Sequence, residues 1–136
     1  MSDQTIIYKT ALAVFKDRKM IMVRTTKNKH VFYTLGGKIE KGEDGIDCLH
    51  REVKEEAGAT IKEGSLKLLR QFEAPAYGRE NTLVNIELYQ GELEEEPTPS
   101  SEVVEIRYFD STVNPKHLTE ITFEMFKWLK ANDYIN

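Results

Sequence analysis

The sequence predicts a mixed α/β (α+β) fold, in which two helices pack on the faces of a β-sheet. Strand-like patterns come before, between and after two stretches with helical periodicity, and this order favours a mixed sheet covered by helices. Residues 83–93 alternate between apolar and polar side chains, as a half-buried strand does. Residues 119–132 instead place apolar side chains on one side at helical spacing.

The length of the chain favours a single domain over residues 1–136, because it suffices for one core and is too short for two independent ones. With 40% hydrophobic and 31% charged residues, the composition is typical of a soluble globular protein. No apolar run approaches the roughly 20 residues that span a bilayer. The first residues lack the basic and apolar segments of a signal peptide, so we expect a cytoplasmic protein without a membrane partner.

Charge and cysteine content narrow the class of function. The formal net charge of −4 argues against a nucleic acid polymer as partner, because such proteins usually carry a basic face. An anionic small molecule would need local positive charge or a bound metal. The single cysteine, Cys48, has no partner for an internal disulfide and no neighbour at zinc-ligand spacing, so we interpret it as a packing residue of a helix.

Three strand patterns precede the first helix. Residues 5–15 carry β-branched and apolar side chains and predict the first strand, which ends at a polar turn, residues 16–18. Residues 20–25 predict a second strand that can pair with the first as a hairpin. Residues 30–35 predict a third, which leads directly into a loop that begins at Gly36. Mobile substrate-binding segments are commonly anchored at such strand-to-helix connections.

Three further strands are expected after that helix. Residues 65–72 predict a strand and residues 73–81, with a proline and a glycine, a connecting loop. The alternating strand at residues 83–93 is followed by a solvated acidic loop at residues 94–101. Residues 103–109 predict the last strand.

The final helix is expected to begin after Thr119, a plausible N-cap, and to end near Asn132. Its apolar stripe, which includes Met125 and Trp128, is interpreted as core. A residual exposed strip could support a dimer, so both a monomer and a homodimer remain open.

The stretch at residues 36–59, GGKIEKGEDGIDCLHREVKEEAGA, carries the candidate chemistry. Two glycines and a turn lead into a helix of about four turns that stops at Gly58. On this helix Glu52, Glu55 and Glu56 are spaced i, i+3 and i+4 and therefore share one face. Each like-charge pair costs a few tenths of a kcal/mol unless a cation lies over the face. A hard divalent cation, which prefers oxygen ligands, would remove that cost.

Neighbouring residues can support such a site. Arg51 can pair with Glu55 or with Glu43 and hold the acidic face in one geometry. Gly36 and Gly37 permit positive φ and close approach of the main chain, so their carbonyl or amide groups can reach an ion or a substrate phosphate.

At these residues the chain resembles the Nudix hydrolase family. The Nudix box, G-x5-E-x7-R-E-U-x-E-E-x-G-U with U a bulky aliphatic residue, is reproduced with the same gaps over 23 positions, about a sixth of the chain. The matching residues are Gly37, Glu43, Arg51, Glu52, Val53, Glu55, Glu56, Gly58 and Ala59. There are two departures. Ala59 is smaller than the usual aliphatic residue, and Leu35 occupies a place where many members carry proline.

The resemblance implies the α/β/α sandwich of the Nudix fold and a metal-dependent hydrolysis of phosphoric anhydride bonds. It implies that Glu52 and Glu56 are the main ligands of Mg²⁺ or Mn²⁺, with the Gly36 carbonyl as a further ligand and Glu55 as a ligand or water-positioning residue.

The general base is left open by the sequence. Glu55 is one candidate, and the resemblance implies another in the loop before the last strand, where Glu102 and Glu105 lie. Each of these two is equally well explained as a surface carboxylate.

Residues outside the box are candidates for substrate binding. Lys38 can contact a phosphate, although a solvated loop lysine is the simpler interpretation. Tyr77 is the best candidate for an exposed aromatic that stacks on a base. Arg24, Arg79 and Asn85 can hydrogen-bond a base or a sugar.

We expect a nucleotide-type substrate, in the first place a nucleoside triphosphate that gives the monophosphate and pyrophosphate. In the family, a proline or a tyrosine shortly after the box is associated with hydrolysis of ADP-ribose or of dinucleoside polyphosphates, respectively. Pro75 and Tyr77 both lie in that window and point in two directions. A different class of function, a non-catalytic nucleotide-binding module on the same fold, would not need the repulsive carboxylates.

Overall fold

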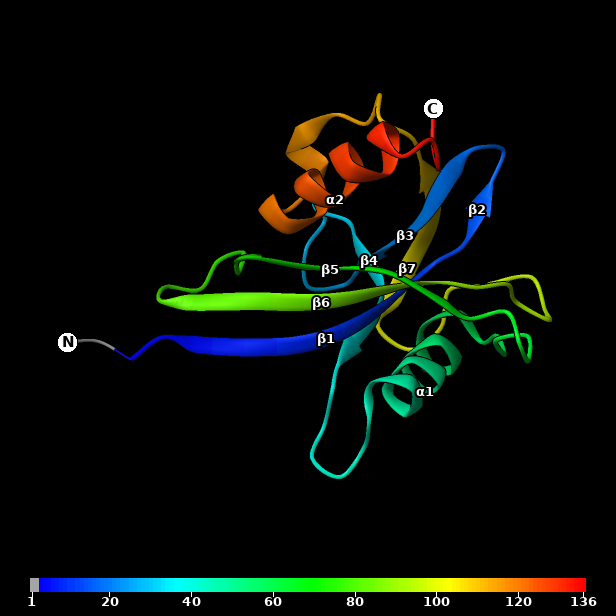
Figure 1. The fold of residues 1–136 in the computed structure, drawn as a ribbon, viewed down its shortest axis with the longest axis horizontal. Coiled ribbons are helices and arrows are strands. Elements are labelled where there is room, and N and C mark those ends of the chain that lie inside the picture. Colours follow the sequence, from blue (N-terminus) through cyan, green and yellow to red (C-terminus); the bar gives the residue numbers. More distant parts are fainter. Residues whose placement is uncertain (1–2) are drawn as a thin grey trace.

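In the computed structural model, which describes residues 3–136, α-helices lie on both sides of a seven-stranded mixed β-sheet (Figure 1). The strands are β1 (Thr5–Ala13), β2 (Phe15–Lys16), β3 (Lys19–Thr25), β4 (Tyr33–Lys38), β5 (Lys67–Pro75), β6 (Thr82–Gln90) and β7 (Val103–Phe109). The helices are α1 (Gly45–Ala57), the short 3-10 helix η1 (Pro115–His117) and α2 (Glu120–Ala131). The predicted mixed sheet with helices on its faces is therefore confirmed.

The strand β1 lies at the centre of the sheet. The strand order is β2-β3-β4-β1-β6-β5, and β7 pairs with β3 on a branch from this path. β1 runs antiparallel to β4 and parallel to β6. The expected hairpin of the first two strands forms only at the two residues of β2, because the chain turns back there through Asp17 and Arg18, both with positive φ.

The two glycines before α1 lie inside a strand and not in the predicted loop. β4 runs from Tyr33 to Lys38, so Gly36 pairs with Ala11 and Gly37 pairs with Thr10 of β1. Gly36 has a φ of +149°, and a β carbon at this position would collide with the main chain of Thr10. Glycine therefore allows β4 to approach β1 closely, which fixes the strand beside the acidic helix.

Both ends of α1 are defined by local hydrogen bonds. The Asp44 side chain accepts a hydrogen bond from the main chain of Asp47 at 2.8 Å, and Gly58 ends the helix in the left-handed conformation with φ of 62°. One side of the helix is buried against the sheet through Cys48, Leu49, Val53 and Ala57. The predicted helix, its glycine stop and the packing role of Cys48 are confirmed.

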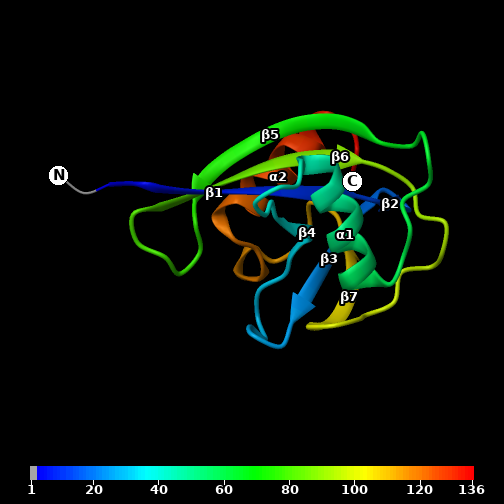
Figure 2. The same ribbon diagram turned by 90° about the horizontal axis from the view of Figure 1, so that it is seen from below.

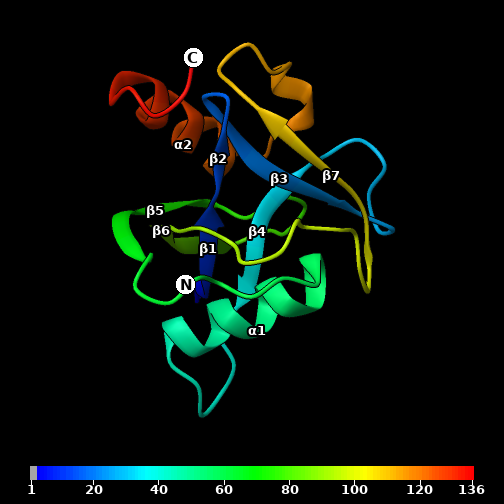
Figure 3. The same cartoon turned by 90° about the vertical axis from the view of Figure 1, so that its right-hand side faces the viewer.

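The second helix covers the opposite face of the sheet (Figures 2 and 3). Thr119 and Thr122 form a reciprocal capping box at its start, and Asn132 follows its last residue, so the predicted bounds hold. Its buried stripe packs on β5, where Trp128 contacts Phe72 edge to face. The sheet thus has a separate apolar core on each side.

Within the described part of the chain, neither helix has the length and apolar character needed to cross a bilayer.

Candidate active site

A cavity of about 480 Å³ lies between the sheet, the acidic side of α1 and the start of α2. This volume is in the range of small-molecule binding sites. The residues that line it come from α1, α2, four strands and the loops between elements. They are Ile7, Lys9, Val23, Thr25, Lys27, Tyr33, Thr34, Gly36, Gly37, Lys38, Glu52, Glu56, Ala76, Tyr77, Arg79, Val84, Ile86, Glu102, Thr119, Ile121 and Thr122.

Two of the predicted metal ligands, Glu52 and Glu56, line this cavity. The main-chain N–H of Gly36 donates a hydrogen bond to Oε1 of Glu56 at 2.9 Å. A β carbon at Gly37 would lie 2.5 Å from Cδ of Glu52, so the glycine leaves room for this carboxylate beside β4. The close packing of strand and helix brings main-chain groups and carboxylates together.

Both carboxylates are partly desolvated by burial, and this raises the pKa of each. Burial raises the pKa of Glu56 to about 8, and the nearby charge of Glu52 acts in the same direction, while the Gly36 hydrogen bond opposes them. Burial also raises the pKa of Glu52, against the effect of Arg51. Among residues 3–136, Glu56 has no ion-pair partner, and for Glu52 the effect of burial outweighs that of Arg51. A hard divalent cation would favour the charged forms of both carboxylates.

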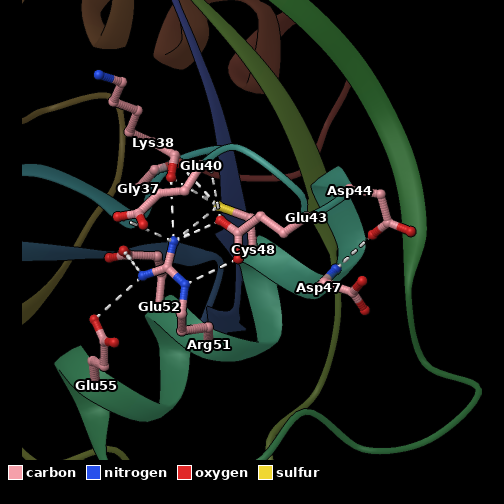
Figure 4. Close-up of polar contacts among 10 residues, drawn as sticks. All are labelled: Gly37, Lys38, Glu40, Glu43, Asp44, Asp47, Cys48, Arg51, Glu52 and Glu55. Atoms are coloured by element: carbon pink, nitrogen blue, oxygen red, sulfur yellow. Dashed lines mark hydrogen bonds and ion pairs between the residues drawn. The ribbon is translucent and has the colours of Figure 1, made fainter.

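Arg51 forms ion pairs with glutamates of α1 and of the turn before it (Figure 4). Its guanidinium lies 2.7 Å from Oε1 of Glu43, 2.6 Å from Oε1 of Glu52 and 3.5 Å from Oε2 of Glu55. The predicted pairing of Arg51 with Glu43 and with Glu55 is therefore found, and Glu52 is added to it. The hydrogen bond from Arg51 lowers the pKa of Glu43 to about 2, and Glu43 also accepts one from the main chain of Glu40 at 2.9 Å. These bonds tie the turn before α1 to the helix.

The expected convergence of three carboxylates is incomplete. Glu55 lies outside the cavity lining, with its side chain 53% exposed beside Arg51 (Figure 4). Residues four apart differ by only about 40° around a helix, so Glu52 and Glu56 face the same way, whereas Glu55 is rotated away from both by at least about 60°. Across residues 3–136, no group of three His, Cys, Asp or Glu side chains is already arranged to hold a metal ion. The role of Glu55 stays a prediction.

Lys9 of β1 is a cavity residue that the sequence analysis missed. It lies on the face of β1 that also carries Ile7, and both residues line the cavity. Burial lowers the pKa of Lys9, while the charges of Glu56 and Glu52 raise it. A lysine at an inward-facing position of a predicted strand is the sequence feature that could have indicated this role.

Several predicted substrate-binding residues also line the cavity: Lys38, Tyr77 and Arg79. Tyr77 is 55% exposed, as expected for an aromatic available to a ligand. Of the two carboxylates proposed from the loop and strand after residue 101, Glu102 lines the cavity, 3.6 Å from the Lys27 ammonium.

Besides Arg51 and Glu55, three predicted site residues lie outside the cavity lining: Arg24, Asn85 and Glu105. Arg24 of β3 pairs with Glu105 of β7 at 2.9 Å, and Arg107 contacts the same carboxylate, so the pKa of Glu105 is lowered mainly by the Arg24 hydrogen bond. Asn85 is on the face of β6 opposite to the cavity residue Val84, where it donates to Glu73 at 2.8 Å. For Arg24 and Asn85, contact with a ligand in this cavity is therefore not supported.

The N-terminus of α2 contributes Thr119, Ile121 and Thr122 to the cavity. The sequence predicts Thr119 as the cap of this helix and its apolar stripe as core, because helix spacing does not reveal what lies beyond the end of a helix. The two threonines bond to each other, which leaves an apolar surface formed by Ile121 with Val84 and Ile86 at this end.

The family model described as NUDIX domain matches residues 8–130. No curated protein sequence matches the chain significantly.

Solved structures of proteins that are named for different activities share the fold. MutT protein from Methanosarcina mazei Go1 is 16% identical, with a TM-score of 0.75 over 97% of this chain and 98% of that chain. A C. elegans Ap4A hydrolase is 17% identical, with a TM-score of 0.65 over 93% and 96%. An ADP-ribose pyrophosphatase from Streptococcus suis 89-1591 is 19% identical, with a TM-score of 0.58 over 91% and 87%. These likenesses show the shared fold alone.

Proposed function

Because the chain belongs to the Nudix hydrolase family, whose members act on phosphoric anhydride bonds, we propose that it is a metal-dependent pyrophosphohydrolase that cleaves a nucleoside triphosphate to the monophosphate and pyrophosphate. The observation that carries this proposal is the cavity itself. It places the partly desolvated carboxylates of Glu52 and Glu56 in the same space as the cationic side chains Lys9, Lys38 and Arg79. Opposite charges in one cavity suit a cation and a polyphosphate bound together.

A divalent cation, Mg²⁺ or Mn²⁺, would be held by Glu52 and Glu56, with the Gly36 carbonyl as the further ligand that the family resemblance implies. Glu55 would join them or position a water molecule. When bound, such a cation neutralises charge on the phosphate oxygens and lowers the pKa of water.

The protein groups bind and orient the substrate. Lys9, Lys38 and Arg79 would hold the phosphates, since ammonium and guanidinium groups donate strongly to phosphate oxygens. Glu102 is the better candidate for a loop general base, because it lines the cavity, whereas two arginines engage Glu105.

The organic part of the substrate would lie toward the apolar end of the cavity. Val84, Ile86 and Ile121 offer a surface for a base, and Tyr77 offers an aromatic face near the opening. A cavity of about 480 Å³ suits one nucleoside with its phosphates, which favours a mononucleotide.

A second candidate substrate is a dinucleoside polyphosphate. Of the two residues after the box that point to different substrates, Tyr77 lines the cavity, whereas Pro75 ends β5 outside it. This placement favours the tyrosine-associated substrate over ADP-ribose, and the second nucleoside would then extend beyond the cavity.

Product identity tests the proposal. The chain is incubated with Mg²⁺ and a panel of nucleoside triphosphates, dinucleoside polyphosphates and ADP-ribose, and the products are separated by ion exchange. We expect a monophosphate and pyrophosphate from at least one triphosphate, and no release with EDTA. A nucleotide-dependent rise in melting temperature without any release would instead favour the non-catalytic binding module.

A further inference from the structure

Lys9 and Lys38 stand directly opposite each other in the antiparallel pairing of β1 with β4. Both side chains line the cavity, and like charges at directly opposed positions destabilise a sheet. Among residues 3–136, no carboxylate lies within ion-pair distance of Lys9, Lys38 or Arg79. Three cationic groups, none of them in a close ion pair, therefore gather in the cavity of a chain whose net charge is −4.

The two lysines have different surroundings. Lys9 is half-buried and lines the same cavity as Glu56, Glu52 and Arg79; the two carboxylate charges raise its pKa, while burial and Arg79 lower it. Lys38 is exposed, and its side chain extends away from Arg51, Glu52 and Glu55 (Figure 4). Of these two lysines, Lys9 is therefore the one that interacts with Glu52 and Glu56, the proposed ligands of the cation.

We propose that Lys9 couples cation binding to substrate binding. Without a divalent cation, the Lys9 ammonium is stabilised by Glu56 and Glu52 in their charged forms. Once these carboxylates engage a divalent cation, Lys9 loses its anionic partners and is left beside Arg79, so its ammonium binds a phosphate of the substrate. This inference rests on the proposed function, because it needs a cation at Glu52 and Glu56.

The coupling has a consequence for each ligand alone and for both together. Lys9 competes with the cation for the same carboxylates, so it weakens cation binding when no phosphate is present. A phosphate removes the repulsion, so each ligand strengthens the binding of the other by the same factor. A residue with a merely structural role would not act in opposite directions on the two affinities.

The experiment measures two affinities in Lys9→Met, which keeps the length of the side chain and removes its charge. Mn²⁺ binding is followed by the electron paramagnetic resonance signal of free Mn²⁺. Phosphate binding is followed by calorimetry with imidodiphosphate, a base-free probe with a P–N–P bridge, in saturating Mn²⁺. We expect Mn²⁺ to bind about 3- to 10-fold more tightly than to the wild type and imidodiphosphate about tenfold more weakly.

Lys38→Met is the matched control on the opposing strand. It should weaken imidodiphosphate binding and leave Mn²⁺ affinity within about twofold of the wild type, because Lys38 is exposed and extends away from Glu52. Lys9→Arg should keep Mn²⁺ affinity near the wild-type value, since the charge remains. If Lys9→Met does not fold, Lys9→Gln carries the same two expectations.

Unchanged or weaker Mn²⁺ binding by the neutral Lys9 variant would overturn the coupling, even where the wild type binds Mn²⁺ and hydrolyses nucleotides. A wild type that binds no Mn²⁺ and releases no product would overturn the proposed function and the coupling with it. The two failures are therefore distinguished by the wild-type measurements.

Discussion

Glu43 and Glu56 belong to the same sequence box, yet their carboxylates have opposite environments. Glu43 bonds to the Arg51 guanidinium at 2.7 Å, which lowers its pKa to about 2. Glu56 has one main-chain donor, and burial raises its pKa to about 8. Both glutamates belong to one acidic motif, so countercharge and burial decide their roles. Glu43 stabilises the turn before α1 through Arg51, whereas Glu56 is available to bind a cation.

Neutralising Glu56 should have the largest effect. Glu56→Gln removes a proposed metal ligand, so we expect product release to fall at least about a hundredfold. Because the variant also removes a desolvated carboxyl group, its melting temperature in EDTA should equal or exceed that of the wild type. Product release is measured by ion exchange and folding by circular dichroism. Wild-type turnover in this variant would remove Glu56 from the site.

Glu102 and Glu105 extend the same contrast to the opposite side of the cavity. Glu102→Gln should lower kcat about 10- to 100-fold, as expected for loss of a general base. Glu105→Gln should leave kcat within about threefold and lower the melting temperature, because it breaks the pairing with Arg24. Steady-state kinetics on both variants checks this. The reverse order of kcat losses would contradict the assignment.

A methyl group at Gly37 tests how closely the strand must approach the acidic helix. Gly37→Ala places a β carbon 2.5 Å from Cδ of Glu52 and must displace that carboxylate. We expect kcat to fall about tenfold, since misplaced catalytic groups are costly. Gly64→Ala is the control outside the cavity lining: its β carbon would meet no atom within 4 Å, so it should leave kcat unchanged, although its φ of +79° makes alanine strained there and lowers stability. Equal kcat in Gly37→Ala and the wild type would show that the position of Glu52 is not critical.

Glu43 gives the smallest effect, on stability against pH. Its folded pKa of about 2 lies below the ordinary 4.5, so its stabilising contribution is complete above pH 4.5 and is lost as the pH falls toward 2. We expect the wild type to be more stable than Glu43→Gln at pH 6 and this difference to shrink between pH 5 and pH 3. Urea unfolding at these pH values measures it. A difference that does not depend on pH would mean that Arg51 does not act through the Glu43 charge.

Local signals predicted the helices and the last strand well. The Gly58 stop and the Thr119 cap depend on side chains within one helical turn, so the sequence alone identifies them. β7 begins and ends where its alternation predicts, at Val103 and Phe109.

Long-range pairing explains what the sequence could not predict. Gly36 and Gly37 look like a loop until β1 is placed beside them, and Lys9 becomes a cavity residue only through the same pairing. The alternation of β6 does not reveal which of its faces meets the cavity, so the sequence could not show that Asn85 lies on the other face. Arg24 depends on a partner from β7, far along the chain.

The central claim is that Glu52 and Glu56 hold a divalent cation at the cavity. Its most direct test is an anomalous difference map from crystals grown with Mn²⁺. We predict a peak within about 2.0–2.4 Å of carboxylate oxygens from both residues, on the cavity side of α1. A map without a peak there, with Glu52 still bonded to Arg51 and Glu56 to Gly36, would show that these two carboxylates do not hold the cation.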